Sequence, residues 1–341
     1  MYDKNNLKER CDRILEDNGG KVADRARTIL LKDPALKDLR PPLEFISKNW
    51  RNSLTPALMS LSCEAVGGRP EETYETALAM TLTSLSLYLW DDIIDKASVK
   101  SFKPTLFGKF GEGMALVIGG LASAKAFSIL NHIDVDKPTH QTVNKLLWNF
   151  LVKMARAETA SLRLRSQKNS SPEEKFCKIK TEAADLETCL KIGAIIGNGT
   201  QSEIQHLGRY GQCLGIILEL WKDFHVSVNL TLELAEKIRK GTLPYSILWA
   251  SKRSEKIRRK LEDLSSKNTI ERAHIKEIVE DALETKVFEN TVKTIRRFTK
   301  KGREELFELK RNKATRTLQL FIEAQPQLFI GSLSTLQALG S

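Results

Sequence analysis

Leu87–Asp95, LYLWDDIID, is the stretch around which the rest of this sequence is organised. An apolar helical run ends here in the three acids Asp91, Asp92 and Asp95. Asp91 and Asp95 share one helix face, and Asp92 lies about one turn before Asp95. Because like charges at this spacing repel, either water solvates them at a helix end or a hard cation holds them together. Oxygen ligands with no His or Cys nearby suit Mg²⁺, whose shell is completed by water and substrate phosphate.

The composition favours a large helical core under a basic surface. The chain has 341 residues, of which 41% are hydrophobic and 28% charged, with only 19 Gly and 10 Pro. The formal net charge of +11 allows nucleic acid, an anionic membrane surface or an anionic substrate as partner. Lys and Arg are mixed with Glu along helical segments, and no nucleic-acid motif is present, so we expect no nucleic-acid partner.

Cysteine usage and apolar runs predict a cytoplasmic location. The five cysteines are odd in number, far apart and without a zinc spacing, which indicates reduced core thiols. The first residues, MYDKNNLKERCDRILEDN, are polar rather than a signal peptide. Apolar runs such as Met114–Ala122 are too short to span a bilayer.

Helical periodicity runs through the whole chain, without a convincing stretch of period-2 alternation. We therefore predict an all-α single domain of about ten or more helices around a central cavity. The expected division is an N-terminal helical extension over 1–40, the main domain over 41–325 and a C-terminal tail over 326–341.

Four stretches in a fixed order resemble one known family. They are LYLWDDIID, the helix 103–127 with KPTLFGKFGEGMALVIGGLASAKAF, the helix 180–197 with KTEAADLETCLKIGAIIG, and the segment 209–250 that ends in KGTLPYSILWA. Together they resemble the trans-isoprenyl diphosphate synthases and, more broadly, the class I isoprenoid synthases. The resemblance covers residues 40–325.

The resemblance implies a helical bundle whose central cavity holds a prenyl chain, with Mg²⁺, up to three ions, clamping its diphosphate. Asp91, Asp92 and Asp95 match the metal-binding first aspartate-rich motif, and Asp91 and Asp95 are the catalytic acids. Lys180 and Lys240 match the diphosphate-binding lysines. An allylic prenyl diphosphate substrate and a homodimer are implied in the same way. Neutralising the leaving diphosphate is the physical reason for both metals and lysines.

One departure concerns the binding of a second, homoallylic diphosphate. The family's Gly-Lys-x-Arg-Pro type motif falls on residues 51–56, RNSLTP, which places Asn52 and Thr55 at the cationic positions. The family's Arg-Arg pair falls on Lys100 and Ser101. Arg51, Lys100 and Lys103 could partly compensate. Burying a diphosphate without bidentate arginines is costly even so, and we expect this second site to be weak or absent.

A second departure concerns the second aspartate-rich motif. It falls on residues 222–226, KDFHV, and keeps only Asp223, which is the third predicted catalytic acid. One helix face there carries oxygen side chains at successive steps of four, which resembles the second metal site of terpene cyclases; a solvated helix face is the alternative. These predicted metal ligands are Glu219, Asp223, Ser227 and Thr231.

Thr83, Ser86 and Leu87 precede the first motif and are the predicted chain-pocket residues. In the family, large aromatic residues at these positions shorten the pocket. Their absence favours a long prenyl chain.

Three functions remain open. The favoured interpretation is a terpene-synthase-like enzyme that ionises one allylic diphosphate and cyclises, eliminates or hydrolyses it, because the second substrate site is lost. The first alternative is a prenyltransferase, which either elongates through an altered site or uses another acceptor. The second alternative is a catalytically silent partner subunit, because the second motif is eroded. The basic C-terminal third is hypothesised to contact an anionic membrane peripherally.

Overall fold

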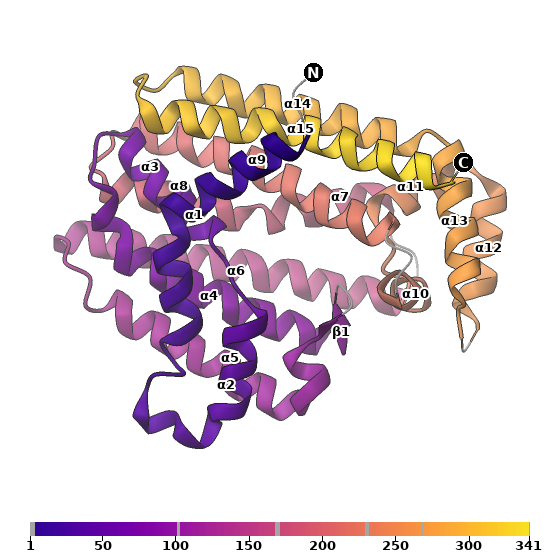
Figure 1. Ribbon diagram of the computed structural model, residues 1–341, viewed down its shortest axis with the longest axis horizontal. Coiled ribbons are helices and arrows are strands. Elements are labelled where there is room, and N and C mark those ends of the chain that lie inside the picture. The colour runs from indigo at the N-terminus through magenta and orange to yellow at the C-terminus, as the bar shows by residue number, and fades with distance from the viewer. Residues whose placement is uncertain (1–3, 101–102, 168–170, 229–231, 268, 341) are drawn as a thin grey trace.

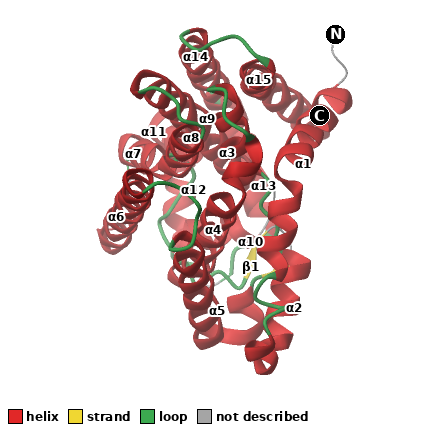
Figure 2. Cartoon of the chain, turned by 90° about the vertical axis from the view of Figure 1, so that its left-hand side faces the viewer, coloured by secondary structure: helices red, strands yellow, loops and turns green. Residues whose placement is uncertain are grey.

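The computed structural model describes residues 4–100, 103–167, 171–228, 232–267 and 269–340, and within them the chain is all-α apart from one short hairpin (Figures 1 and 2). In the first half, the helices are α1 Lys4–Thr28, the 3₁₀ helix η1 Pro34–Leu39, α2 Arg40–Asn49, α3 Leu54–Ala65, the 3₁₀ helix η2 Pro70–Thr73, α4 Tyr74–Ile94, α5 Leu106–Leu130 and α6 Lys137–Gln167. In the second half, they are α7 Pro172–Glu182, α8 Ala184–Ile196, α9 Gln201–Val228, α10 Leu232–Arg239, α11 Tyr245–Arg253, α12 Glu255–Ser265, α13 Arg272–Glu284, α14 Val287–Phe307 and α15 Lys313–Gly340.

The hairpin lies between α4 and α5. Its strands, β1 Val99–Lys100 and β2 Lys103–Pro104, run antiparallel, with Lys100 opposite Lys103. It follows directly after the acidic end of α4. The hairpin therefore fixes Lys100 beside the aspartates.

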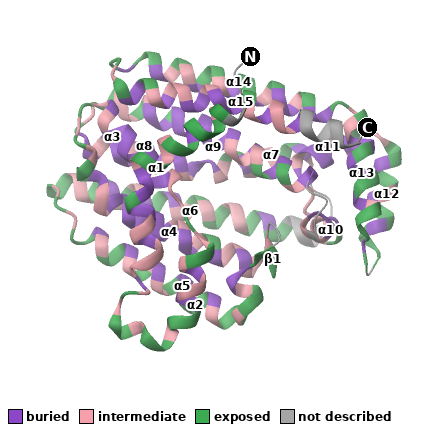
Figure 3. Ribbon diagram, viewed as in Figure 1, coloured by how far each residue is buried: buried purple, intermediate pink, exposed green. Residues whose placement is uncertain are grey.

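The centre of the molecule is a layer of α3, α8 and α9, covered on one side by α14 and α15 and on the other by α4, α5 and α6 (Figure 1). Buried residues gather on the central helices, whereas α2, α5 and α12 carry exposed outer faces (Figure 3). α4 is apolar on nearly all sides because Leu, Ala, Met, Thr and Ser fill it. Apart from Glu75 in its first turn, its acids come at the C-terminal end.

Two glycines let these helices pack closely. A Cβ atom on Gly193 of α8 would lie 2.3 Å from the backbone oxygen of Met59 in α3. A Cβ atom on Gly119 of α5 would lie 2.6 Å from Nε1 of Trp90 in α4. The Met59 oxygen belongs to the backbone, so the α3–α8 pair requires a residue without a side chain at position 193, whereas the Trp90 side chain would have to shift to admit a Cβ atom at position 119.

The division of the chain into three segments stays a prediction, and four structural features bear on the expectations from the sequence. The N-terminal helix α1 packs against α3, α4 and α15. α15 continues as one helix across the boundary expected at residues 325 and 326. The helix expected over 180–197 is broken at Ala183 into α7 and α8. Cys177 is exposed, while the other four cysteines are buried and all five are free.

Helix α5 is longer than the apolar run Met114–Ala122, which lies within it. Its 25 residues are long and apolar enough to cross a membrane, judged by length and composition alone. One face packs against α4, and the opposite face is open, with Leu116, Val117 and Phe127 between 41% and 49% exposed.

Candidate functional site

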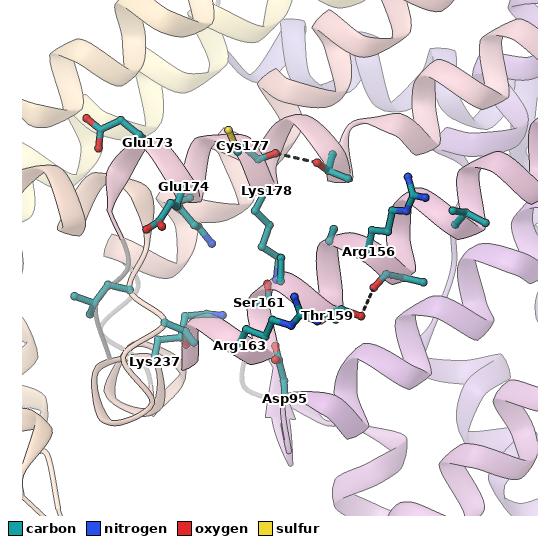
Figure 4. A pocket seen from close by; sticks show the side chains of 18 residues that line it. Asp95, Arg156, Thr159, Ser161, Arg163, Glu173, Glu174, Cys177, Lys178 and Lys237 are labelled. Carbon is teal, nitrogen blue, oxygen red and sulfur yellow. Dashed lines mark hydrogen bonds between the residues drawn. The ribbon is translucent and has the colours of Figure 1, made fainter. Parts of the chain in front are cut away.

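A pocket of about 940 Å³ lies between the second half of α6, helix α7 and the turn from α10 to α11, and Asp95 reaches it from the end of α4 (Figure 4). Its charged lining residues are the cations Arg156, Arg163, Lys175, Lys178 and Lys237 and the acids Asp95, Glu173 and Glu174. Small and apolar side chains, among them Val152, Ala155, Ala157 and Leu243, form the rest of the wall. Excess positive charge beside an apolar wall suits a ligand with an anionic head and an apolar body.

Helix α7 holds two of these cations in place. Its first turn is fixed by a capping box, in which Ser171 and Glu174 each accept a hydrogen bond from the other's backbone N–H. Lys175 and Lys178 are one helical turn apart and therefore share the face that lines the pocket. Figure 4 shows Lys178 extending from α7 toward α6. The longer contacts of Lys178, 3.6 Å to Glu158 and 3.5 Å to Glu182, leave its ammonium group loosely held.

The acids at the end of α4 form a tight cluster with Lys100 of the hairpin. The Lys100 Nζ atom lies 2.7 Å from Asp91 Oδ2 and 2.6 Å from Asp92 Oδ1. Asp92 is fully buried, and neither of its oxygens has a well-aligned hydrogen bond, since Lys100 meets it only as an ion pair. Asp95 lies apart from this pair and lines the pocket.

The two neighbouring acids have pKa values shifted in opposite directions. Burial raises the pKa of Asp92 to about 6, although the charge of Lys100 acts against it. Burial also acts to raise the pKa of Asp91, but the charge and hydrogen bond of Lys100 outweigh it and leave that pKa below its ordinary value. Asp91 is therefore the more easily ionised of the two carboxyl groups, whereas Asp92 takes up a proton more readily.

Lys240 connects the turn after α10 to the end of α4 by a hydrogen bond. Its Nζ donates a hydrogen bond to the backbone oxygen of Asp95 and lies 3.1 Å from Glu236 Oε2. It is absent from the described lining of the pocket. In this position Lys240 orients Asp95, and its predicted contact with a diphosphate stays a prediction.

The side chains of the second predicted metal site do not face the pocket together. Asp223 accepts a hydrogen bond from the Tyr245 N–H at 2.6 Å and lies 3.4 Å from Lys175 Nζ. Ser227 donates its hydroxyl hydrogen to the backbone oxygen of Asp223. Glu219 pairs with Lys222 at 2.6 Å. Thr231 lies outside the described residues.

Burial is the largest influence on the pKa values of two carboxyl groups at the second predicted metal site. It raises the pKa of Asp223, even though Lys175 and the Tyr245 N–H act to lower it. Burial also raises the pKa of Glu219 to about 7, with Lys222 acting against it. Carboxylates in such surroundings are costly to ionise unless a cation stays beside them.

Lys180, also on α7, is absent from the described lining of the pocket. It is exposed, and its Nζ sits 5.1 Å from the centre of the Phe176 ring. The resemblance selected Lys180, but the pocket-lining lysines of this helix are Lys175 and Lys178. Their spacing of three was visible in the sequence; their direction was not, because it depends on how α7 packs.

At the position expected for a second diphosphate, Arg51 is already paired with acids. Arg51 forms a bidentate pair with Glu16 and a further contact with Asp24, both on α1. Asn52 donates a hydrogen bond to the buried Thr55 hydroxyl. Ser101 lies outside the described residues.

The predicted chain-pocket residues are placed differently from one another. Ser86 donates a hydrogen bond to the Gly119 backbone oxygen and so faces α5. The buried Thr83 donates to the Ala79 oxygen of its own helix. Leu87 is partly buried against the core. In the described residues, none of the three lines the pocket.

The donor set fits a metal at the first motif and not at the second. Within the described part of the chain, no three acidic, histidine or cysteine side chains converge to cage an ion. Mg²⁺ commonly takes only one or two protein carboxylates and obtains its other oxygens from water and phosphate. Asp95 lines the cationic pocket and meets that requirement, whereas Asp91, one turn before it, is paired with Lys100 at 2.7 Å. At the second motif, Lys175 and a backbone N–H already hold the one remaining aspartate.

A sequence profile of the polyprenyl synthetase family matches residues 39–282, more than half of the chain. The chain belongs to the polyprenyl synthetase family. A curated relative, the chloroplastic geranylgeranyl pyrophosphate synthase 3 of Arabidopsis thaliana, is 30% identical over 224 residues. That match covers 60% of this chain and 61% of the relative, so the chain spans less than two thirds of that relative's length.

Solved structures of the family have the same fold. A geranylgeranyl pyrophosphate synthetase from Pyrococcus horikoshii has a TM-score of 0.79 at 23% identity, covering 94% of this chain and 98% of that one. A polyprenyl synthase from Caulobacter crescentus, complexed with calcium and isoprenyl diphosphate, has a TM-score of 0.80 at 16% identity, covering 93% and 97%.

These matches confirm the predicted family and all-α fold and identify a prenyltransferase-type enzyme. They do not confirm the favoured terpene-synthase-like interpretation. The matched proteins are named as synthases of prenyl diphosphates, which fits the prenyltransferase alternative better.

Proposed function

We propose that this protein is a prenyltransferase that binds one allylic prenyl diphosphate in the pocket between α6 and α7 and transfers its prenyl group to an acceptor other than a second diphosphate. One observation carries the proposal. The pocket joins five cationic side chains to an apolar wall, whereas Arg51, at the position of a second diphosphate, is already bound by two acids of α1.

The chemistry begins when the bond between the allylic carbon and the diphosphate oxygen breaks. The electron pair leaves with the diphosphate, and the allylic carbon becomes a cation. An electron pair of the acceptor then forms the new carbon bond, and the acceptor loses a proton to the departing diphosphate or to water. The cost of this step is the charge that develops on the leaving oxygen.

The residues of the chain lower that cost by position and charge. Lys178 and Lys237 place ammonium groups at the pocket where the diphosphate would leave. Lys240 holds the end of α4 through the Asp95 backbone oxygen and so orients that carboxylate. Mg²⁺, implied by the resemblance, would be held by Asp91 and Asp95 and would add positive charge to the leaving group. Val152, Ala155 and the neighbouring small side chains exclude water from the prenyl chain.

Chain elongation with a homoallylic diphosphate requires a second set of unpaired cations, because an unneutralised diphosphate is expensive to desolvate. Arg51 would have to leave Glu16 and Asp24 to supply one. This makes an uncharged nucleophile the better acceptor. The pairing of Arg51 also supports a second candidate, the intramolecular cyclisation of a single allylic substrate. That reaction shares the ionisation step and needs no acceptor.

The test is one incubation series with the purified full chain and Mg²⁺. Geranyl, farnesyl or geranylgeranyl diphosphate is supplied alone, with isopentenyl diphosphate, or with uncharged aromatic or hydroxyl acceptors, and released diphosphate and extractable products are followed. Turnover that requires an uncharged acceptor and falls in Asp95→Asn supports the proposal. Turnover that requires isopentenyl diphosphate overturns it and restores elongation. Turnover of the allylic substrate alone assigns cyclisation or hydrolysis, and none in any mixture leaves a silent subunit.

We also propose that a second copy of the chain covers the open face of α5. Leu116, Val117 and Phe127 form an apolar stripe there, and Gly120 between them leaves room for a close neighbour. Exposed apolar stripes of this kind are typical of interfaces. A homodimer would bury this apolar stripe against a second copy of the chain.

A cytoplasmic location and peripheral contact with an anionic membrane are further proposals. The free state of the five cysteines supports the first. The exposed cations Lys293, Arg296 and Lys300 on the outer face of α14 support the second. Salt-sensitive co-sedimentation with anionic vesicles is expected, and no difference between anionic and neutral vesicles would contradict membrane contact.

A further inference from the structure

The region of the second aspartate-rich motif has lost acids and lies beside lysines. By the resemblance, its first and last acidic positions are Lys222 and Val226 in this chain. Lys222 is exposed and pairs with Glu219. Asp223 is the one aspartate left in the motif. The sequence alone therefore removes two of three oxygen ligands from this side of the pocket.

The remaining aspartate is held as the partner of a lysine. Its Oδ2 accepts the Tyr245 N–H, and its Oδ1 faces Lys175, whose side chain is 22% exposed against 8% for Asp223. The separation of 3.4 Å between Lys175 Nζ and Asp223 Oδ1 is wide for an ion pair. Lys175 therefore keeps donor capacity for another anion while it neutralises Asp223.

Three ammonium groups line the same pocket at this point. Lys175 and Lys178 come from α7, and Lys237 comes from α10. Burial and the charge of Lys175 both lower the pKa of Lys237. Like charges gathered in one partly buried space cost free energy, which a bound polyanion would recover.

We propose that Lys175, Lys178 and Lys237 take the place of metal ions at the second motif, so that ammonium groups neutralise this side of the diphosphate and metal binding is confined to Asp91 and Asp95. This inference rests on the proposed function for the identity of the ligand. It makes a separate claim about how that ligand is held. The diphosphate keeps part of its binding free energy when no divalent metal is present.

The first experiment is isothermal titration of the full chain with inorganic pyrophosphate in EDTA and again with Mg²⁺. Measurable binding in EDTA is expected, and Lys178→Ala or Lys237→Ala should each weaken it about tenfold, as for loss of one charge-assisted contact. The matched control is Lys48→Ala, which removes one exposed lysine from α2, outside the pocket, and should leave the affinity unchanged. No binding in EDTA, or an equal loss in the control, overturns the inference.

The second experiment counts metal ions. Mn²⁺ bound per chain in the presence of pyrophosphate is measured by electron paramagnetic resonance for wild type, Asp95→Asn and Asp223→Asn. The expected result is that Asp95→Asn loses Mn²⁺ whereas Asp223→Asn retains the wild-type number. Loss of Mn²⁺ in Asp223→Asn would assign a metal to the second motif and contradict the inference. If that variant does not fold, the wild-type and Lys237→Ala titrations in EDTA still decide.

The two hypotheses fail in different ways. Binding of pyrophosphate in EDTA without turnover of any allylic diphosphate overturns the proposed function and leaves the lysine site standing. Turnover of allylic diphosphates with no pyrophosphate binding in EDTA supports the proposed function and overturns the lysine site.

Discussion

Lys178 and Lys180 are two positions apart on α7 and lie in different surroundings. Lys178 lines the pocket and is loosely paired, whereas Lys180 is exposed over Phe176. We expect Lys178→Ala to weaken pyrophosphate binding by about 1.5 kcal/mol, as for loss of a charge-assisted hydrogen bond, and Lys180→Ala to leave it unchanged. Titration calorimetry of the two variants in one buffer measures the difference.

The two substitutions are matched in charge, helix and size. A larger loss in Lys180→Ala would mean that α7 turns when the ligand binds, and the assignment drawn from the family resemblance would then hold instead.

Asp92 predicts a stability that depends on pH. Its folded pKa of about 6 is above the ordinary value of 3.8, so the folded state binds this proton more tightly. The cost of ionising Asp92 is absent below about pH 4 and complete above about pH 6, where a shift of about two units corresponds to about 3 kcal/mol as an upper limit. Asp92→Asn should therefore raise the free energy of unfolding at pH 7.5 and change it little at pH 3.5.

Urea unfolding of both proteins at the two pH values, in EDTA, provides the check. If Asp92→Asn is less stable than wild type at pH 7.5, then the ion pair with Lys100 outweighs burial, and Asp92 is charged in the folded protein.

At the scale of elements, the close approach of α8 to α3 requires a glycine at position 193. A methyl group at Gly193 would meet the Met59 backbone oxygen, which has no flexible end that could move aside. We expect Gly193→Ala to destabilise the protein by roughly 2 kcal/mol or more, as overpacking of a core does. Thermal or urea unfolding measures it.

Gly113 of α5 is the matched control, because a Cβ atom there would meet nothing within 4 Å. Ala has the higher helix propensity, so Gly113→Ala should be neutral or stabilising by up to about 1 kcal/mol. Equal losses at both glycines would contradict the assignment of the effect to the close approach of α8 to α3.

At the scale of the whole molecule, the open face of α5 predicts assembly. Val117 is 48% exposed in the apolar stripe, and a charge there would be buried in the proposed dimer. Val117→Glu should therefore shift the mass measured by sedimentation from two chains toward one. Phe307→Glu, at an exposed aromatic residue of α14, is the control and should leave the mass unchanged. A wild-type protein that sediments as a monomer would contradict the dimer.

The sequence by itself determined the family, the helical class and the acids of the first motif. These depend on local spacing: residues four apart share a helix face in almost any helix, and four motifs in order are a property of the chain. Asp95 comes directly after the last residue of α4, one turn beyond Asp91, and lines the pocket.

Only the tertiary structure decided which cations surround the pocket and which groups are already committed. The break at Ala183 sets how α7 lies, so Lys178 rather than Lys180 lines the pocket. The packing of α7 on α9 brings Lys175 to Asp223, and the packing of α1 on α3 lies behind the pairing of Arg51 with Glu16. Such partners are far apart in the chain, and the periodicity of one helix carries no information about the side chains of another.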